Sequence, residues 1–317
     1  MNNLDVIFSS DEQYSRHLGV SITSLLENNN KFETINIYVI DRDINNENKK
    51  RIINIVNKYK TNIQFINFKY IENKIRSNID NSKSISIYAR LYIQSILPKE
   101  VKKIIYFDCD SIINYDLTEL WNININGYYV AGVEDTIPNK YKQVIGLCKN
   151  DIYINSGMLL INLEKWRKDN LEEKFTQFIN IYNGFVPHHD QGVINGICKG
   201  KILKIHPKYN CNSNFYSFSS KEIEKIFNIN KYYNQIELDE AINKPVFLHY
   251  TPGFLGRPWT KECIHPKKDL YLKYKKLTPW KDELLQKDYS NWKVKSLSKA
   301  YKLIPRKIFI KIYKSIM

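Results

Sequence analysis

The chain has 317 residues, of which 43% are hydrophobic and 26% charged, and its formal net charge is +15. This balance excludes an intrinsically disordered protein and provides core material for one large or two ordinary domains. The five cysteines form no C-x-x-C pair, which argues against a disulfide framework and a zinc site. Without a signal-like start or an apolar run of about 18 residues, we expect a cytoplasmic chain with no membrane span.

Strands and helices alternate in the first part of the chain. Apolar runs at residues 4–10, 35–40 and 63–68 predict buried strands, and helically spaced apolar residues follow the first two. Asn45 is the expected cap of the second of these helices. Such alternation predicts an α/β fold with a mostly parallel sheet, in which ligands bind beyond the carboxyl ends of the strands. Asp11 follows the first strand and should lie at that edge.

An acidic pair follows a later strand. The apolar residues 104–107 run directly into Asp108 and Asp110, which lie two positions apart and can reach one ligand. Two carboxylates this close repel each other unless a cation lies between them, so a divalent metal is the natural partner. The alternative is a pair of solvated turn residues, because short acidic turns are common after strands.

The middle of the chain adds polar residues near further element ends. A helix is expected over residues 87–97 with Arg90 on it, and a strand over 128–133 precedes Asp135. A turn at Asn155 feeds a buried strand, after which a single helix is expected over residues 164–182. Adjacent helical residues point about 100° apart, so His188 and His189 should not ligate one metal together. Asp190 and Gln191 are the more informative pair.

The last part of the chain contains a strand end, a glycine loop and a basic tail. The apolar residues 246–250 include His249, and the loop that follows carries Gly253 and Arg257, a composition that suits a phosphate group. Residues 293–317 hold eight basic residues and no acidic one, with apolar residues every three or four positions and a break expected at Pro305. Such a helix suits an anionic membrane surface, and the alternative is packing on the protein's own core.

Together these segments resemble glycosyltransferase family 8, the retaining enzymes that include bacterial lipopolysaccharide galactosyl- and glucosyltransferases and glycogenin. The similarity covers roughly residues 4–259, with six motifs in the family's order. The motifs are Asp11-Glu12-Gln13-Tyr14, Tyr88-Ala89-Arg90-Leu91, Tyr106-Phe107-Asp108-Cys109-Asp110, residues 155–163 with Trp166-Arg167, Asp190-Gln191, and His249-Tyr250 with Pro258-Trp259. Gln13 and Arg257 depart from the Asn and Lys that relatives often carry, and the loop over residues 251–257 looks longer.

The resemblance implies a GT-A fold, a Rossmann-like nucleotide-diphospho-sugar transferase architecture with a mixed, mostly parallel sheet flanked by helices. It implies Mn²⁺, or Mg²⁺ in its place, held by Asp108, Asp110 and His249. It further implies UDP-galactose or UDP-glucose as the donor and a saccharide or glycolipid as the acceptor, in lipopolysaccharide or other surface glycan synthesis. The donor's nucleotide and diphosphate would be held by Asp11, Gln13, Tyr14, Asp108, Cys109, Asp110, Gly253 and Arg257.

The same resemblance assigns the sugar hydroxyls to Arg90, Asp135, Asn155, Asp190 and Gln191, with Gln191 beneath the anomeric carbon. Residues 1–260 would form the catalytic domain, and residues 261–317 a helical C-terminal region whose basic tail associates with the inner face of the cell membrane. No nucleic-acid partner is expected, because the basic residues concentrate in the tail and no recognition motif is present.

Two other function classes compete with this interpretation. Apolar residues before an Asp-x-Asp motif also occur in haloacid-dehalogenase-like phosphatases, but there the motif lies on an early strand, and the segments around Asn155 and His249 would go unexplained. A basic nucleic-acid-binding protein would account for the net charge of +15, though not for its concentration in an amphipathic tail.

Overall fold

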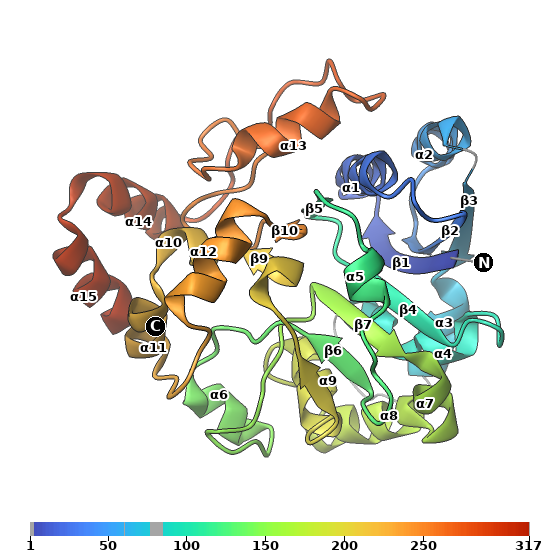
Figure 1. Cartoon of the computed structure of the whole chain (residues 1–317), viewed down its shortest axis with the longest axis horizontal. Coiled ribbons are helices and arrows are strands. Elements are labelled where there is room, and N and C mark those ends of the chain that lie inside the picture. The colour runs from blue at the N-terminus through green and yellow to red at the C-terminus, as the bar shows by residue number, and fades with distance from the viewer. Residues whose placement is uncertain (1–2, 60, 77–84, 317) are drawn as a thin grey trace.

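The computed structural model describes residues 3–59, 61–76 and 85–316 of the chain. In this part of the chain a seven-stranded sheet has the order β3-β2-β1-β4-β7-β6-β8, and a three-stranded sheet has the order β5-β10-β9 (Figure 1). Within the larger sheet β7 runs antiparallel to β4 and β6, and the other neighbours are parallel. The predicted mostly parallel sheet is therefore confirmed. The strands are β1 (Asn3–Asp11), β2 (Thr34–Arg42), β3 (Asn62–Asn67), β4 (Lys103–Phe107), β5 (Ser111–Ile113), β6 (Val130–Gly132), β7 (Met158–Asn162), β8 (Ile202–Lys204), β9 (Cys211–Asn212) and β10 (Phe247–His249).

Helices cover both faces of the larger sheet (Figure 1). The helices of the first half are α1 (Ser15–Asn28), α2 (Asn46–Lys58), α3 (Lys69–Arg76), η1 (Ile85–Tyr92), α4 (Ile93–Ile96), α5 (Thr118–Trp121) and α6 (Asn139–Val144). Those of the second half are α7 (Leu163–Lys168), α8 (Leu171–Ile181), α9 (His189–Ile197), η2 (Pro207–Asn210), α10 (Ser213–Ser217), α11 (Ser220–Phe227), α12 (Gln235–Asn243), α13 (Lys268–Lys275), α14 (Trp292–Leu303) and α15 (Arg306–Ile316).

The alternation of side chains along β1 separates two hydrophobic cores. Val6 and Phe8 belong to the core under α1 and α2, whereas Ile7 between them belongs to the core under α8 and α9. Each side chain is fully buried, and burial of this kind contributes about 1.5–3 kcal/mol per large apolar residue. Strands that are apolar on both sides are expected in a sheet covered on both faces, so the ligand edge is where their polar residues gather.

The structure confirms some local predictions and corrects others. The side chain of Asn45 accepts a hydrogen bond from the backbone N–H of Asn48, so it is the cap that the sequence predicted. The single helix expected over residues 164–182 was wrong. The chain breaks between α7 and α8 because Asn170 takes a left-handed conformation with φ of 49°, which asparagine tolerates better than most residues. Residues 87–97 form a 3₁₀ turn and then a short α-helix rather than one continuous helix.

The segment after residue 260 returns to the first helix. The Tyr271 hydroxyl on α13 lies 2.7 Å from Nδ1 of His17 on α1, and both groups are buried. The indole ring of Trp280 lies so close to Gly19 that a Cβ there would be 2.2 Å from its Cζ3 atom. Only glycine therefore allows this approach, and residues 268–280 are fixed against the β1–α1 unit. The boundary proposed at residue 260 stays a prediction.

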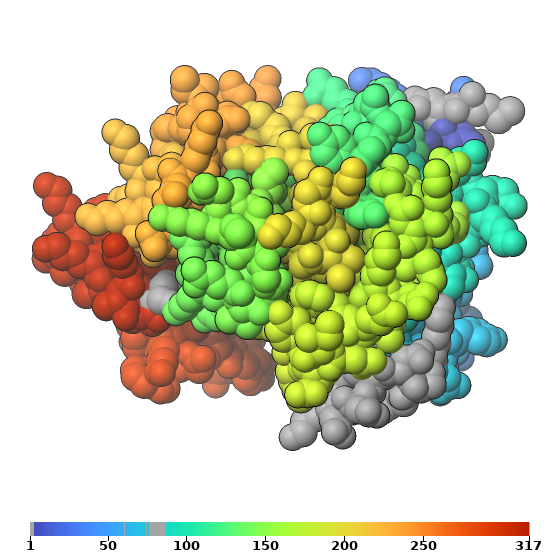
Figure 2. Space-filling model, turned by 90° about the horizontal axis from the view of Figure 1, so that it is seen from below, coloured from blue at the N-terminus to red at the C-terminus, as the bar shows by residue number. Residues whose placement is uncertain are grey.

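The basic tail forms one end of the molecule, as α14 and α15 in Figure 1 and the red surface in Figure 2 show. Phe309 and Ile310 of α15 are buried, and Phe309 stacks with Phe218 of the preceding region at 6.5 Å between ring centroids. In contrast, α14 has no buried residue, and Trp292 and Leu303 are 72% and 81% exposed. The tail thus packs on the protein mainly through α15, while α14 packs through the partly buried Leu297, Ala300 and Tyr301 and leaves its other side exposed. Among the described residues, no helix is both long and apolar enough to cross a membrane.

Candidate active site

Two pairs of strands bring the acidic pair and His249 together. Asp108 and Asp110 lie in the turn between β4 and β5, and the backbone N–H of Asp108 donates to the carbonyl of Gly157 at 2.8 Å. Strand β10 pairs antiparallel with β5 so that His249 lies opposite Ser111. One ligand atom from each of Asp108, Asp110 and His249 lies within 4.8 Å of the other two. The topology therefore gathers three residues that are far apart in the sequence into one cluster.

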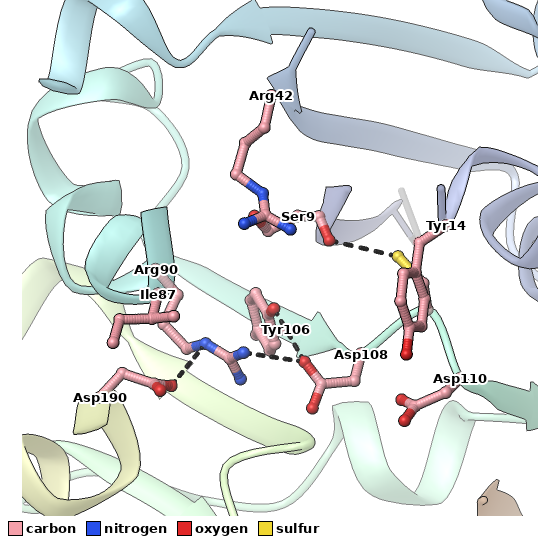
Figure 3. Close-up of a pocket in the computed structure, with 10 residues that line it drawn as sticks. Ser9, Tyr14, Arg42, Ile87, Arg90, Tyr106, Asp108, Asp110 and Asp190 are labelled. Carbon is pink, nitrogen blue, oxygen red and sulfur yellow. Dashed lines mark hydrogen bonds and ion pairs between the residues drawn. The ribbon is translucent and has the colours of Figure 1, made fainter. Parts of the chain in front are cut away.

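Arg90 bridges two acidic residues in the same pocket (Figure 3). Its guanidinium lies 2.9 Å from Asp108 and 2.7 Å from Asp190, and it donates to the carbonyl of Ser156 at 2.8 Å. It also stacks over the Tyr106 ring at 4.1 Å from the ring centroid. Burial raises the pKa of Asp190, and Arg90 offsets part of that rise. Arg90 therefore fixes the position of the buried Asp190 carboxylate next to Asp108.

Arg257 is the second cation of the site. Its guanidinium forms an ion pair with Asp110 and donates to the backbone carbonyl of Tyr250. Burial alone would raise the pKa of Asp110, but Arg257 and His249 outweigh burial, so the pKa is held well below its usual range. Asp110 is therefore ionised at neutral pH, as a ligand for a cation must be.

A network of buried side-chain amides lies next to the cluster of Asp108, Asp110 and His249. Oδ2 of Asp135 accepts hydrogen bonds from Asn155 at 3.1 Å and from Gln191 at 3.0 Å. The amide oxygens of Asn155 and Gln191 accept in turn from the backbone N–H groups of Gly157 and Ser156, at 2.9 and 3.0 Å. Asp135, Asn155 and Gln191 are each less than a tenth exposed. The structure thus fixes the orientation of both amides by hydrogen bonds to the backbone.

Residues of β1, of the β1–α1 loop and of the end of β2 form another part of the pocket lining. Ser9, Tyr14 and Arg42 line it together with Arg90, Asp108, Asp110 and Asp190, as Figure 3 shows. Asp11 accepts from the backbone N–H of Tyr14 at 3.0 Å and pairs with Arg42 at 3.2 Å. Gln13 is exposed on the same loop. The expectation that the end of β1 reaches the edge that carries the acidic pair is met.

Cys109 and Gly253 have little side-chain chemistry at this site. Burial raises the pKa of the Cys109 thiol, which donates to the carbonyl of Ser9 at 3.3 Å. The thiol of Cys109 is therefore neutral and held by a hydrogen bond to the backbone, and the residue lies between Asp108 and Asp110. Gly253 lies in the loop before Arg257, and a Cβ placed there would meet no heavy atom within 4 Å. Steric exclusion does not explain this glycine.

Comparison with known proteins identifies the family of the chain. The sequence profile described as "Glycosyl transferase family 8" matches residues 5–263. The chain belongs to glycosyltransferase family 8. This membership decides against the phosphatase alternative. A putative glycosyltransferase of Haemophilus influenzae is 39% identical over 266 residues, covering 83% of this chain and 74% of that protein.

Two further proteins are similar to the glycosyltransferase over most of its length. A lipopolysaccharide 1,2-glucosyltransferase of Escherichia coli is 26% identical, covering 88% of this chain and 80% of that protein. The crystal structure of the galactosyltransferase LgtC in complex with donor and acceptor sugar analogs superposes with a TM-score of 0.72 at 22% identity, covering 89% of this chain and all of LgtC. This likeness shows that the glycosyltransferase has the GT-A fold.

The three-residue cluster fits a divalent metal. Two carboxylates and one imidazole supply oxygen and nitrogen ligands that suit Mn²⁺ or Mg²⁺, with room left in an octahedral shell for ligand oxygens. Their spacing needs little adjustment, since Nε2 of His249 lies 3.2 Å from Asp110 and 3.8 Å from Asp108. His188 and His189 are absent from the cluster, which is the sole group of its kind found among the described residues.

Sequence reasoning missed two residues of this glycosyltransferase's site. Arg42 lines the pocket, and its Nε atom is buried without a hydrogen-bond partner, yet in the sequence it looks like one charge of a solvated turn, Asp41-Arg42-Asp43. Asn210 is fully buried, and its side-chain oxygen lies 3.1 Å from Nδ1 of His249. No spacing motif marks either residue. Asn210 lies in a polar stretch, Lys208-Tyr209-Asn210-Cys211-Asn212-Ser213-Asn214, in which no sequence signal distinguishes it.

Proposed function

We propose that this glycosyltransferase is a metal-dependent, retaining hexosyltransferase that moves galactose or glucose from a UDP-sugar to a saccharide acceptor. The observation that carries the proposal is the cluster of Asp108, Asp110 and His249, whose two carboxylates line a pocket together with the aromatic ring of Tyr14. A diphosphate needs a cation and a nucleoside needs an aromatic wall, and the pocket offers both within one cavity of ≈ 210 Å³.

On this proposal the donor lies across the carboxyl ends of β1 and β4. Tyr14 packs against the uracil, Asp11 and Gln13 meet the base and ribose, and the backbone around Cys109 follows the nucleotide. Arg257, with the loop at Gly253, exchanges its contact with Asp110 for the diphosphate, which a guanidinium can bind with two parallel hydrogen bonds. A metal held by Asp108, Asp110 and His249 would supply Lewis-acid stabilisation of the charge on the departing UDP.

The sugar would lie over the amide network. Asp135, Asn155 and Asp190 present polar atoms for hydroxyl groups, and Arg90 bridges Asp190 and Asp108 and so offsets the repulsion between the two carboxylates. Gln191 is a weak candidate for a nucleophile, because its amide oxygen already accepts a hydrogen bond from Ser156 N–H. We therefore favour attack of the acceptor on the face from which UDP leaves, with Gln191 orienting the sugar and the leaving phosphate oxygen taking the acceptor's proton.

One assay tests the proposed reaction. The purified protein is incubated with a panel of UDP-sugars and Mn²⁺, and the slow release of UDP by hydrolysis is measured with and without a chelator. We expect release with UDP-galactose or UDP-glucose, loss of release on chelation, and a fall on the order of 10³-fold for Asp110→Ala, equivalent to about 4 kcal/mol of transition-state stabilisation.

The matched control is Glu119→Gln, which removes an exposed carboxylate on α5 that pairs with Lys208. This variant should hydrolyse the donor as the wild type does. Full activity in the presence of chelator, or in Asp110→Ala, would overturn the metal-dependent reaction.

The acceptor is proposed to be a saccharide on a glycolipid, in lipopolysaccharide or another surface glycan, and the protein to work at the inner face of the cell membrane. Support comes from the exposed face of α14, which carries Lys295, Lys299 and Lys302 beside the exposed Trp292 and Leu303. Basic residues next to exposed apolar ones suit an anionic bilayer surface. Because α15 is partly buried, the exposed residues of α14 rather than the whole tail are proposed to make the contact.

A further inference from the structure

A chain of buried hydrogen bonds connects a backbone amide to the imidazole of His249. Gly157 N–H donates to Oδ1 of Asn155 at 2.9 Å, and the side-chain amide of Asn210 donates to the same oxygen at 2.8 Å. The Oδ1 atom of Asn210 lies 3.1 Å from Nδ1 of His249. Asn210 is fully buried, and Asn155 and His249 are less than a tenth exposed. Water therefore has little access to any of these bonds.

The direction of every bond in this chain follows from its first member. A backbone N–H can only donate, so the atom of Asn155 that faces Gly157 must be its oxygen. The group of Asn210 that faces that oxygen must then be its NH₂, which turns the oxygen of Asn210 toward His249. An amide oxygen can only accept, so Nδ1 of His249 carries a proton. The other ring nitrogen, Nε2, faces Asp110 at 3.2 Å and Asp108 at 3.8 Å.

We propose that Asn210 is a positioning residue that holds a proton on Nδ1 of His249, so that Nε2, which faces the carboxylate pair, is the nitrogen that can offer its lone pair to a metal. A metal ligand needs that lone pair, and the hydrogen bond on the far ring nitrogen is what decides which nitrogen offers it. The inference rests on the proposed function to the extent that the cluster binds a metal. It adds a residue that no motif of the chain contains.

The same residue links the metal cluster to the amide network of the sugar side. Asn155 accepts from Asn210 and donates to Oδ2 of Asp135, which also accepts from Gln191. Loss of the Asn210 amide therefore removes one of the hydrogen-bond donors to the buried Oδ1 atom of Asn155. It also removes the acceptor that faces Nδ1 of His249. The backbone holds Asn210 in place, because β9 begins at Cys211 and pairs with Leu248, next to His249.

Three variants separate positioning from mere stability. Asn210→Leu keeps the approximate shape but removes both polar groups. Asn210→Asp keeps an acceptor for Nδ1 of His249 and loses the donor to Asn155. Asn29→Leu is the matched control, because Asn29 is equally buried and bonds only the backbone of Leu25 and Leu117, outside the site.

The first measurement is Mn²⁺ binding by isothermal titration calorimetry without any nucleotide. We expect Asn210→Leu to bind Mn²⁺ about 10–100-fold more weakly, the range typical for loss of a partner that orients a metal-binding histidine. Asn210→Asp and Asn29→Leu should bind Mn²⁺ with an affinity within about threefold of the wild type, a change clearly smaller than the loss expected for Asn210→Leu. Thermal unfolding of each variant checks that it is folded.

The second measurement needs no metal. Long-range ¹H–¹⁵N NMR of the histidine rings, at a pH above the pKa that the neighbouring carboxylates raise, should show neutral His249 protonated at Nδ1 in the wild type and Asn210→Asp, and at Nε2, which faces Asp110, in Asn210→Leu.

An unchanged tautomer in folded Asn210→Leu overturns the inference, as does Mn²⁺ affinity lost equally in Asn210→Leu and Asn210→Asp. A wild type protonated at Nδ1 that binds no divalent metal leaves the tautomer assignment intact and refutes the metal-dependent function instead.

Discussion

His249 lies opposite Ser111 in the antiparallel pairing of β10 with β5, and this register sets its Nε2 atom 3.2 Å from Asp110. A shift of one residue would turn the imidazole to the other face of the small sheet, because side chains alternate along a strand. The cluster thus depends on a strand pairing of three residues. The fully buried side chains of Phe247 and Leu248 anchor β10 in this pairing.

Gly157→Ala should displace His249. A Cβ at this position would lie 2.1 Å from Cε1 of the imidazole, so either the ring or the turn must move. We expect a loss of about 1–3 kcal/mol in the free energy of unfolding and about 10-fold or more in Mn²⁺ affinity. Urea unfolding and calorimetry measure the two effects. Adding His249→Ala should restore much of the stability, because the clash is gone, and a double variant no more stable than Gly157→Ala would contradict this explanation.

Arg257→Gln should change metal and nucleotide binding in opposite directions. The wild-type guanidinium neutralises Asp110, so its removal frees a carboxylate for Mn²⁺ in the absence of nucleotide. The same change removes a cation from the proposed diphosphate site. We expect Mn²⁺ alone to bind up to about tenfold more tightly and UDP with Mn²⁺ about tenfold more weakly, each near 1.4 kcal/mol. Arg257→Lys is the control and should retain most nucleotide affinity; two shifts of the same sign would refute the exchange.

The stability of the protein should fall at mildly acidic pH through His265. Burial lowers the pKa of this residue to about 3, and its ring lies between Tyr216 and Tyr250. Below the unfolded pKa of 6.5 the unfolded chain binds a proton that the native state refuses until about pH 3, so the contribution is full above pH 6.5 and lost across that interval.

The loss from His265 between pH 7 and pH 5 is at most about 2 kcal/mol of unfolding free energy. Urea unfolding at the two pH values measures it, and His265→Gln should show a shallower pH dependence by that amount. Equal pH dependence of wild type and variant would mean that His265 titrates normally in the folded protein.

Replacement of Lys295, Lys299 and Lys302 by glutamine should weaken binding to anionic vesicles. Each basic residue near such a surface contributes on the order of 1 kcal/mol, so the triple variant should bind on the order of 100-fold more weakly. Flotation with phosphatidylglycerol vesicles at several salt concentrations measures this, with phosphatidylcholine vesicles as the control. Hydrolysis of the donor should be unaffected. Undiminished vesicle binding would place the membrane contact elsewhere or remove it.

Deletion of residues 293–317 is a poorer test of the tail, although the sequence alone would suggest it. Phe309 lies in the same core as Phe254, whose ring centroid is 5.3 Å away, and Phe254 belongs to the loop that carries Arg257. The deletion would therefore expose apolar surface and disturb the site at once. Substitutions of Lys295, Lys299 and Lys302 avoid this, because these three side chains of α14 are exposed.

The sequence predicted the elements whose signals are local. The apolar runs gave β1, β2, β3 and β4, and Asp108 and Asp110 followed from their place at a strand end. It could not reveal the left-handed Asn170 that separates α7 from α8, because a single backbone dihedral leaves no periodic trace. The role of Asn210 was not predicted for a different reason. It depends on contacts with His249 and Asn155, which come together only in the folded chain. Residue pairs made by tertiary contact have no spacing rule.

The aromatic contact between Phe254 and the tail has a consequence for protein engineering and for the divergence of relatives. Tyr301, Phe309 and Tyr313 pack their rings against Phe254, at 4.9, 5.3 and 5.5 Å between centroids. The loop over residues 251–257 and the helices over 292–316 therefore form one module. A chimera that exchanges the tail alone mismatches the aromatic contacts of Phe254 close to Arg257. A chimera that exchanges the tail and the loop together keeps these contacts.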